Sequence, residues 1–436
     1  MSADSGVLAD REGVRMATLS LGRVRHAAAS PWVRTVAVLT AVQVISELAF
    51  SFVTPFTPLY IQELGVPDPT EAGVWAGAIS GVSAVLGACV APLWGMVADR
   101  FGHRLMIQRA LLGSGVVILA TSFAQSPVQL LVLRVAQGML SGVVPAIATV
   151  ASLTTPARYL ATVLGMLQAA MFLGVSLGPL FGGVFADLFG LRLGFLVAGT
   201  IMLVLTMLVT TLVPDPRKHS RATNTSDASV GASGGSQRAT RRLMTRELFA
   251  VVCLMGVVRF VNLAPQPVLP LYVQQLVGET EHLGTIVGLV LAATGVAAST
   301  SALLLGRLTD KYGWRPTLLG CLACTIVISP LHLWIGSVWH LLVLRTAMGF
   351  ALGGMFPAIQ ALMILVTPPG RRGAAFGLLA TANAFGNGGG PVVGSLVAAA
   401  YGVPIMFVSM VAVLGGAGWV LTRLRVSGGP RATPSP

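Results

Sequence analysis

The sequence predicts an all-α polytopic membrane protein whose twelve transmembrane helices form two pseudo-symmetric six-helix bundles. Three observations lead to this prediction. Of the 436 residues, 54% are hydrophobic and only 10% are charged, and the mean hydropathy is +0.81. Apolar runs of the length that crosses a bilayer, about 20 residues, recur along the whole chain. A set of short motifs also appears twice, at an offset close to half the chain length.

The clearest repeat is a charged, glycine-containing stretch from Gly95 to Arg104, which recurs from Gly306 to Arg315. We interpret each copy as a short turn between two apolar helices, because glycine permits a tight reversal of the chain. The matched positions are Gly95, Asp99, Arg100, Gly102 and Arg104 in the first copy and Gly306, Asp310, Lys311, Gly313 and Arg315 in the second.

Three further motifs repeat at nearly the same offset. They are Pro58-Leu-Tyr-Ile-Gln-Glu-Leu-Gly65 with Pro270-Leu-Tyr-Val-Gln-Gln-Leu-Val-Gly278, Arg134-x-x-x-Gly138 with Arg345-x-x-x-Gly349, and Gly174-x-x-x-Gly178-Pro179-x-x-Gly182 with Gly386-x-x-x-Gly390-Pro391-x-x-Gly394. Repetition of this kind excludes coincidence. Two halves in the same orientation imply a pseudo-twofold axis along the membrane normal.

The apolar runs divide the chain into five parts. We expect a cytoplasmic tail over 1–33, a six-helix bundle over 34–213, a cytoplasmic linker over 214–246, a second six-helix bundle over 247–423 and a cytoplasmic tail over 424–436. The linker has almost no large apolar residue, so it cannot bury a core. The expected spans are 34–57, 73–94, 105–124, 129–151, 161–184, 193–213, 247–271, 284–305, 317–335, 340–366, 374–399 and 404–422.

The distribution of charge predicts the orientation. Most of the 28 Lys and Arg residues fall in the tails, in the linker and in the loops on the same side of the membrane. Loops rich in Lys and Arg stay in the cytoplasm. We therefore expect a multi-pass protein of the inner or plasma membrane with both termini in the cytoplasm. This topology accounts for the net charge of +13, so no nucleic-acid partner is expected.

No pattern indicates an enzyme, a cofactor or a metal site. The sequence has no G-x-x-x-x-G-K-[ST] phosphate loop, so no ATP-driven step is expected. Its six His residues show no metal-ligand spacing. Cys321-x-x-Cys324 has a redox or metal spacing, but it lies in an expected span without a neighbouring His or carboxylate. We interpret these cysteines as packing residues.

The repeated motifs resemble those of the major facilitator superfamily. The Gly95–Arg104 stretch is similar to the signature of its loop between helices 2 and 3, Arg134-x-x-x-Gly138 is similar to its helix 4 signature, and Gly174–Gly183 is similar to the helix 5 signature of its antiporters. Pro55–Tyr60 resembles the drug:proton antiporters with twelve spans, and Pro58–Gly65 and Ala91–Asp99 most resemble the MdtG group of bacterial multidrug exporters. The resemblance covers residues 34–423 and implies a secondary transporter that works by alternating access.

Glu47 is the carboxylate that this placement puts deep in a span. It lies about 20 Å along the first helix from Arg34, near the middle of a hydrocarbon core about 30 Å thick. Ionisable residues inside a membrane are usually functional, and low-dielectric surroundings favour the neutral form of a carboxyl group. We interpret Glu47 as a proton acceptor. The alternative is a structural ion pair or a hydrogen bond to a neighbour such as Ser46.

The repeat gives Glu47 a candidate partner. Position 259, an offset of 212 residues from position 47, is an arginine. The resemblance implies that helices 1 and 7 face each other across a central cavity. We hypothesise that Glu47 and Arg259 pair in at least one state and that protonation of Glu47 weakens the pair.

Arg134 and Arg345 are the other arginines within expected spans. The resemblance implies a role in proton coupling for Arg134, and Arg345 is its repeat equivalent; the alternative for both is extension of the side chain to the interface. Three arginines and one glutamate predict a cavity that accepts neutral, zwitterionic or anionic molecules better than dications. Further cavity candidates, with packing as the alternative for each, are Asn383, Asn387, Gln43, Gln168 and Asn262.

The resemblance also implies residues that govern the change of conformation. Asp99 would bind the N-terminus of helix 11 and lock the outward-facing state, with a purely topological turn as the alternative. The segment Ala151–Thr155 lacks the acid that completes a charge relay in some relatives. Gly174, Gly178 and Gly182 share one helix face, which permits close packing, and Pro179 can kink the helix. We interpret this helix as a seal of the cavity, with ordinary close packing as the alternative.

The expected function is therefore export of amphipathic small molecules, antibiotics included, in exchange for protons, by a monomer in the lipid bilayer. The first alternative is proton-coupled uptake or exchange of an organic anion, with Arg259, Arg134 and Arg345 as its ligands. The second alternative, a non-transporting membrane sensor or channel, would require an appended domain or a continuous polar stripe, and neither is apparent in the sequence.

Overall fold

The computed structural model describes residues 31–213, 246–278, 280–368 and 372–423. Every regular element within these ranges is a helix, and no residue in them forms a strand. The prediction of an all-α fold is therefore confirmed. The expected linker and the two expected tails lie outside the described residues, except at their edges.

The first half of the described chain runs from Pro31 to Leu212. Its helices are α2 (Pro31–Val53), η1 (Thr54–Phe56), α3 (Thr57–Glu63), α4 (Pro69–Phe101), α5 (His103–Thr121), α6 (Pro127–Leu140), α7 (Val143–Thr154), η2 (Ala157–Tyr159), α8 (Leu160–Phe189) and α9 (Leu191–Leu212). The first span continues to Glu63, beyond its expected end at 57. Pro55 and Pro58 lie in the first turns of η1 and α3, where a missing N–H group costs no hydrogen bond.

The second half runs from Arg246 to Arg423. Its helices are α12 (Arg246–Leu263), α13 (Leu269–Val277), α14 (Leu283–Tyr312), α15 (Trp314–Ile328), η3 (Ser329–Trp334), α16 (Val338–Val366), α17 (Arg372–Tyr401) and α18 (Val403–Arg423). The expected span at 247–271 is divided into α12 and α13. Pro265 and Pro267 fall between them, and proline cannot donate the hydrogen bond that continues a helix.

Each expected span has a helical counterpart. Nine helical segments within the described ranges are long and apolar enough to cross a membrane. The other expected spans correspond to α12 with α13, to α17 and to α18. The fourth span consists of α6 and α7, which are separated at Ser141 and Gly142. Gly142 has φ +122°, a backbone conformation that glycine adopts without steric cost.

The two charged repeats are mostly helix rather than turn. Helix α4 continues past Gly95, and only Gly102 separates it from α5; helix α14 continues past Gly306, and only Gly313 separates it from α15. Gly102 and Gly313 have φ +105° and +90°. One residue with positive φ is enough to reverse the chain, so the expectation that each turn begins at Gly95 or Gly306 is wrong.

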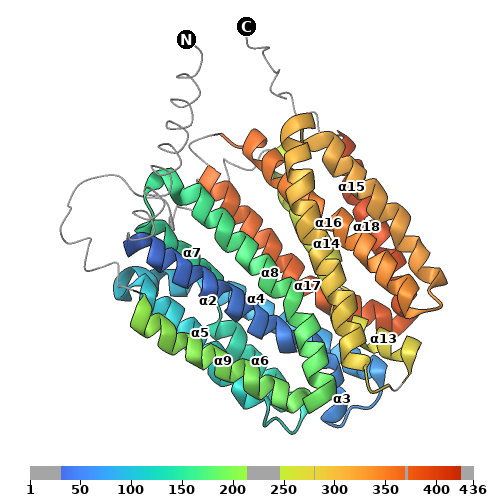
Figure 1. Cartoon of the computed structure of the whole chain (residues 1–436). Helices are drawn as coiled ribbons and strands as arrows, with labels where there is room; N and C mark the ends of the chain where they lie inside the picture. The colour runs from blue at the N-terminus through green and yellow to red at the C-terminus, as the bar shows by residue number, and fades with distance from the viewer. Residues whose placement is uncertain (1–30, 214–245, 279, 369–371, 424–436) are drawn as a thin grey trace, which may run out of the picture.

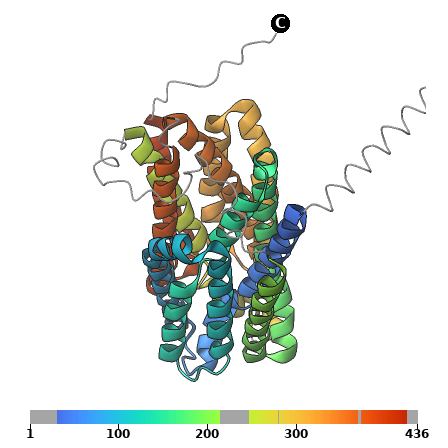
Figure 2. The same cartoon turned by 90° about the vertical axis from the view of Figure 1, so that its left-hand side faces the viewer.

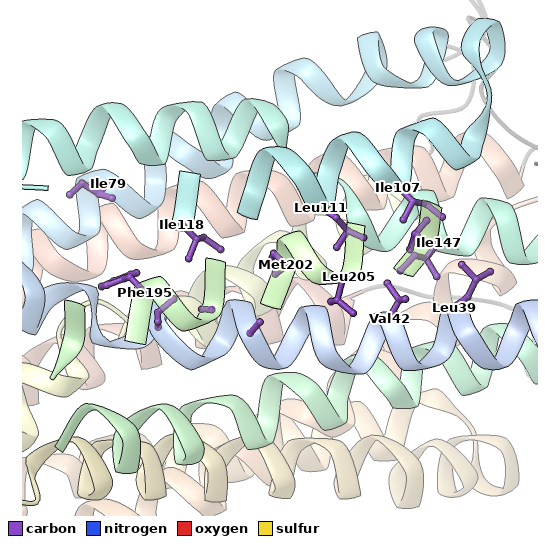
Figure 3. Packing of buried hydrophobic residues seen from close by; sticks show 14 of the residues in the cluster. Leu39, Val42, Ile79, Ile107, Leu111, Ile118, Ile147, Phe195, Met202 and Leu205 are labelled. Carbon is purple, nitrogen blue, oxygen red and sulfur yellow. The ribbon is translucent and has the colours of Figure 1, made fainter. Parts of the chain in front are cut away.

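Each half has its own apolar core. The core of the first half lies between α2, α5, α7 and α9 and contains the side chains of Leu39, Val42, Ile107, Leu111, Ile147, Met202 and Leu205 (Figure 3). A separate cluster in the second half joins α12, α15, α16 and α18 and contains Val251, Leu322, Met355, Ile359 and Phe407. In Figure 2 the halves form two groups of ribbons, blue to green and yellow to red. Most of the buried apolar packing is therefore internal to one half or the other.

The two halves touch at one end of the molecule. We call the end that holds Pro31, the start of α2, and Arg423, the end of α18, the termini face, and the other end the opposite face (Figure 1). At the opposite face Gly183 of α8 approaches Gly284 of α14, and Gly77 of α4 approaches Ser395 of α17. Figure 1 shows α8 and α14 crossing there and separating toward the termini face. The structure is therefore closed at the opposite face and separated at the termini face.

Glycines set the spacing of helices within each half. The glycines of the repeated motif pack α8 onto α2 and α17 onto α12; they are Gly174, Gly178 and Gly182 in the first half and Gly386, Gly390 and Gly394 in the second. A Cβ at Gly182 would overlap the carbonyl oxygen of Phe52. These positions therefore serve close packing within a half, and their effect on a seal stays a prediction.

Replacement of Gly182 by alanine should destabilise the protein, because the new methyl group has no space against the Phe52 backbone. Overpacking of this kind costs about 1–3 kcal/mol. We expect Gly182→Ala to lower the melting temperature of the detergent-solubilised protein, measured as loss of monodisperse protein on heating.

Gly165→Ala is the matched control for this measurement. Gly165 lies on the same helix, and a Cβ there would have nothing within 4 Å. Since alanine favours helix more than glycine does, the control should keep or raise the melting temperature. Equal melting temperatures for the two variants would contradict the packing account.

Candidate functional site

Glu47 lies on α2 where that helix packs against α8. Its side chain is half-buried, and Gln43 Nε2 donates a long hydrogen bond of 3.4 Å to Glu47 Oε1. Gly174 allows the two helices to meet here, because a Cβ on it would lie 2.6 Å from Glu47 Cβ. Within the described ranges, no Lys, Arg or His nitrogen lies within 4.0 Å of the carboxylate. A carboxyl group held this loosely inside a helical bundle is able to accept a proton.

Arg259 occupies the corresponding place in the second half. Arg259 Nε donates to Asn383 Oδ1 at 3.1 Å, and its guanidinium carbon lies 4.8 Å from the centre of the Phe356 ring. An aromatic face stabilises a cation at this distance. A Cβ on Gly386 would lie 2.5 Å from Arg259 Cβ. Phe356 of α16 and Asn383 of α17 therefore both hold the guanidinium of Arg259 in place.

The positions of Glu47 and Arg259 are equivalent in packing as well as in sequence. Each lies against the first glycine of the repeated motif, Gly174 or Gly386, with the same offset of 212 residues between the copies. The two side chains do not pair in this conformation, since each has an amide as its hydrogen-bond partner. Their ion pair stays a prediction for another state.

Arg134 is buried inside the first half, with only 5% of its surface exposed. Its Nη1 donates to Gln137 Oε1 at 2.7 Å and its Nη2 donates to Thr57 Oγ1 at 3.0 Å. The guanidinium carbon also lies 6.0 Å from the centre of the Phe195 ring. Arg134 therefore ties the fourth span to the first rather than extending to the membrane interface.

Arg345 has the equivalent position in the second half and is 6% exposed. Its guanidinium carbon lies 5.7 Å from the ring centre of Phe407, against which His332 stacks at 4.1 Å between ring centres. Of the four charged side chains predicted within spans, only Glu47 and Arg259 are more than marginally exposed. Arg134 and Arg345 are thus almost enclosed in this conformation, and an excess of positive charge in a cavity stays a prediction.

The amino-acid sequence matches the model of one known protein family over most of its length. The family model described as Major Facilitator Superfamily matches residues 39–284 and 279–436. The chain belongs to the major facilitator superfamily. Members of this superfamily are membrane transporters, so the protein is a transporter and not an enzyme.

Relatives within the superfamily share most of the chain. The protein is 31% identical over 369 residues to "Multidrug resistance protein MdtG" of Proteus mirabilis (strain HI4320), an alignment that covers 84% of this chain and 89% of the relative. It is also 31% identical over 376 residues to the protein of the same name from Citrobacter koseri, covering 86% and 91%. The resemblance to the MdtG group predicted from the motifs is confirmed.

Solved structures of the superfamily have the same fold. The chain matches a bacterial homolog of the human lysosomal transporter Spinster, in an inward-facing and unoccupied conformation, with a TM-score of 0.75 and 16% identity over 90% of this chain and 96% of that one. The human organic anion transporter MFSD10 matches with a TM-score of 0.63 and 17% identity over 90% and 100%. These likenesses confirm the major facilitator fold.

The charged repeat of the superfamily lies at the termini face. Arg104 donates to the carbonyl oxygen of Thr210 and so connects α5 to α9, while Arg100 lies 5.6 Å from the centre of the neighbouring Phe101 ring. Asp99 is exposed. In the second copy Asp310 and Arg315 are exposed as well. The binding of Asp99 to the N-terminus of helix 11 stays a prediction.

The predicted polar residues form two groups, one in each half. Gln43 lies with Glu47, and Asn383 lies with Arg259. Asn387 follows Asn383 by about one turn, and its buried Oδ1 has no hydrogen-bond partner within the described ranges. Gln168 is exposed, with Nε2 at 3.9 Å from Met171 Sδ, and Asn262 is half-buried. The structure thus joins Gln43 and Asn383 to the charged positions by hydrogen bonds, and among the described residues it shows no such bond for Gln168 or Asn262.

Sequence reasoning missed the aromatic partners of the arginines. Phe195 and Phe407 stand 212 residues apart, so the repeat that linked Arg134 to Arg345 contained a signal for them as well. Phe356 carries no such signal, because it belongs to none of the repeated motifs. Thr57 lies in the motif Pro55–Tyr60, yet only the structure shows that it accepts a hydrogen bond from Arg134.

Cysteines placed at the four charged positions should differ in reactivity. We expect Glu47→Cys and Arg259→Cys to react with a water-soluble methanethiosulfonate reagent faster than Arg134→Cys and Arg345→Cys by about an order of magnitude, since buried side chains react only after local opening. Labelling rates in native membranes, in a background without the four natural cysteines, measure this difference. Labelling of Arg134→Cys as fast as Glu47→Cys would contradict the buried arrangement.

Proposed function

We propose that this transporter exports amphipathic small molecules, antibiotics among them, in exchange for protons. The observation that carries the proposal is the half-buried Glu47, which lies within a span and has no cationic partner among the described residues. The chain is also 31% identical to proteins named for multidrug resistance. A carboxyl group in this position can alternate between a proton-bound and a charged form, which exchange for protons requires.

The termini face is assigned to the cytoplasm in this proposal. Arg100, Arg104 and Arg315 lie at that face, while Glu71 and Asp187 lie near helix ends at the opposite face. Basic residues on one side of the membrane mark the cytoplasmic side. The structure, closed at the opposite face, then represents the inward-facing state of an alternating-access cycle.

Each half contributes one charged residue to the coupling of proton movement to drug export. Glu47 accepts a proton on the first half, and Arg259 supplies a positive charge on the second. Loss of the proton leaves Glu47 charged and able to attract Arg259 when the halves close at the termini face. Arg134 has an indirect role in coupling. Its hydrogen bond to Thr57 holds the fourth span against α3, the helix that continues from α2 and Glu47.

The charges that remain partly exposed define the class of substrate. One acid and one base, Glu47 and Arg259, suit neutral, zwitterionic or singly charged molecules with a large apolar part. A binding site for such molecules is mostly apolar with a few fixed polar groups. The organic-anion alternative needed three arginines as ligands, and two of them, Arg134 and Arg345, are almost fully buried. Export of amphipathic molecules is therefore the better-supported function.

Exchange can be measured in inside-out membrane vesicles that hold an acidic lumen. Addition of a substrate drug should make the lumen more alkaline, because each drug molecule that enters drives protons out. In Glu47→Gln this drug-induced alkalinisation should be lost, since an amide cannot take up the proton. The reporter is a pH-sensitive dye in the lumen.

Glu71→Gln is the matched control, because Glu71 is an exposed carboxylate in the first turn of α4, and it should respond like the unchanged protein. A full response in Glu47→Gln would remove Glu47 from the proton route. Absence of any drug response, together with counterflow of an organic anion that Arg259→Gln abolishes, would favour the anion alternative.

A further inference from the structure

The first turn of α14 receives its cap from the other half of the molecule. Asp187, near the end of α8, accepts hydrogen bonds from Gly284 N and Thr285 N, each at 2.7 Å, and from Thr285 Oγ1 at 2.5 Å. The N-cap residue of α14, His282, makes no side-chain capping bond itself. The first N–H groups of a helix have no partner within the helix, so Asp187 satisfies donors that α14 leaves unpaired.

The equivalent helix of the first half shows the more usual arrangement. Asp68, the N-cap of α4, accepts from Thr70 N at 3.3 Å and from Glu71 N at 3.1 Å, all within one segment. The repeat places Ala399 where the second half would need a carboxylate to match Asp187. Among the described residues, the contact of α8 with α14 therefore has this ionic cap, and the equivalent contact of α17 with α4 does not.

We propose that Asp187 is a latch that holds the two halves together at the opposite face. The inference rests on the alternating access proposed above, in which this contact opens once in each cycle. Hydrogen bonds to a carboxylate are stronger than those between neutral groups, and the positive end of the α14 dipole adds to the attraction. Separation of the halves removes all three bonds at once.

The surroundings of Asp187 fit a contact that closes tightly and then opens. Gly183 and Gly284 allow backbone contact beside it, since a Cβ on Gly284 would lie 2.6 Å from the Gly183 carbonyl oxygen. Asp187 also borders a cavity of about 260 Å³ whose other polar side chains are Gln62, Glu63 and Gln274. A cavity of this size and polarity can hold water, and water can satisfy the freed groups when the latch opens.

The test measures the population of the two conformations directly. Spin labels on Val128→Cys with Trp339→Cys report the opposite face, and spin labels on Leu153→Cys with Leu365→Cys report the termini face. All four positions are exposed, at the ends of the fourth and tenth spans. Distances are measured by double electron–electron resonance in lipid nanodiscs, without drug and at one pH, after replacement of the natural cysteines.

Asp187→Asn should raise the ratio of molecules separated at the opposite face to molecules closed there by about tenfold, because the charge that binds the α14 N-terminus is gone. Asp68→Asn is the matched control: it weakens a cap of the same kind within one half and should leave both distance distributions unchanged. Thr285→Val keeps both backbone donors, removes only the hydroxyl donor, and should give a smaller shift in the same direction.

Unchanged distributions in both Asp187→Asn and Thr285→Val would overturn the latch. The same conclusion would follow if Asp68→Asn gave an equal shift. Size-exclusion profiles identify any variant that fails to fold, and Thr285→Val then decides the question. The readout needs neither drug nor proton gradient, so a shift in the distances together with absent drug exchange would reject the proposed export and leave the latch intact.

Discussion

Helices in this protein pack closely at positions where one of the two helices has a glycine. The other features of the structure depend on this close packing. One face of α8 packs on α2 through Gly174, Gly178 and Gly182, and a neighbouring face reaches α14 through Gly183. Lipid provides no hydrophobic drive for helices to associate, so close backbone contact supplies dispersion energy in its place. The same helix is thus fixed within its own half and contacts the other half along the part from Ser176 to Asp187. Two rigid halves joined at one face are the arrangement that alternating access requires.

The same close contacts determine what the charged residues can do. Gly174 and Gly386 bring a neighbouring helix against Glu47 and Arg259 in the same way, so the duplication places one acid and one base at equivalent positions. The other two arginines are enclosed in their own halves against Phe195 and Phe407. We therefore propose two roles for charge inside the membrane of this protein. One pair is enclosed and connects helices within a half, while the other pair keeps some exposure and is available for coupling.

Much of this arrangement could be predicted from the sequence. Lipid permits only helices or closed barrels, so apolar runs of sufficient length already indicate the spans, and the repeat indicates equivalence between Glu47 and Arg259. The sequence could not show that Arg134 is enclosed while Arg259 is not. In a helix that is apolar all round, the residues that face lipid resemble those that face the core. The sequence of such a helix therefore does not show which of its faces points to lipid. The latch at Asp187 could not be predicted from the sequence either, because Asp187 binds backbone N–H groups nearly 100 positions away, and backbone groups leave no sequence pattern.

The most direct test of alternating access between two rigid halves is a reversible cross-link at the opposite face. Asp187→Cys with Thr285→Cys, in a background without the natural cysteines, places two thiols where the structure has side chains in contact across α8 and α14. Bridging them with a short bis-methanethiosulfonate reagent keeps that face closed. Drug-dependent proton exchange should then stop, and a reducing agent should restore it to the level of the uncross-linked variant. Exchange at an undiminished rate in the fully cross-linked protein would show that this contact need not open, and would contradict the account.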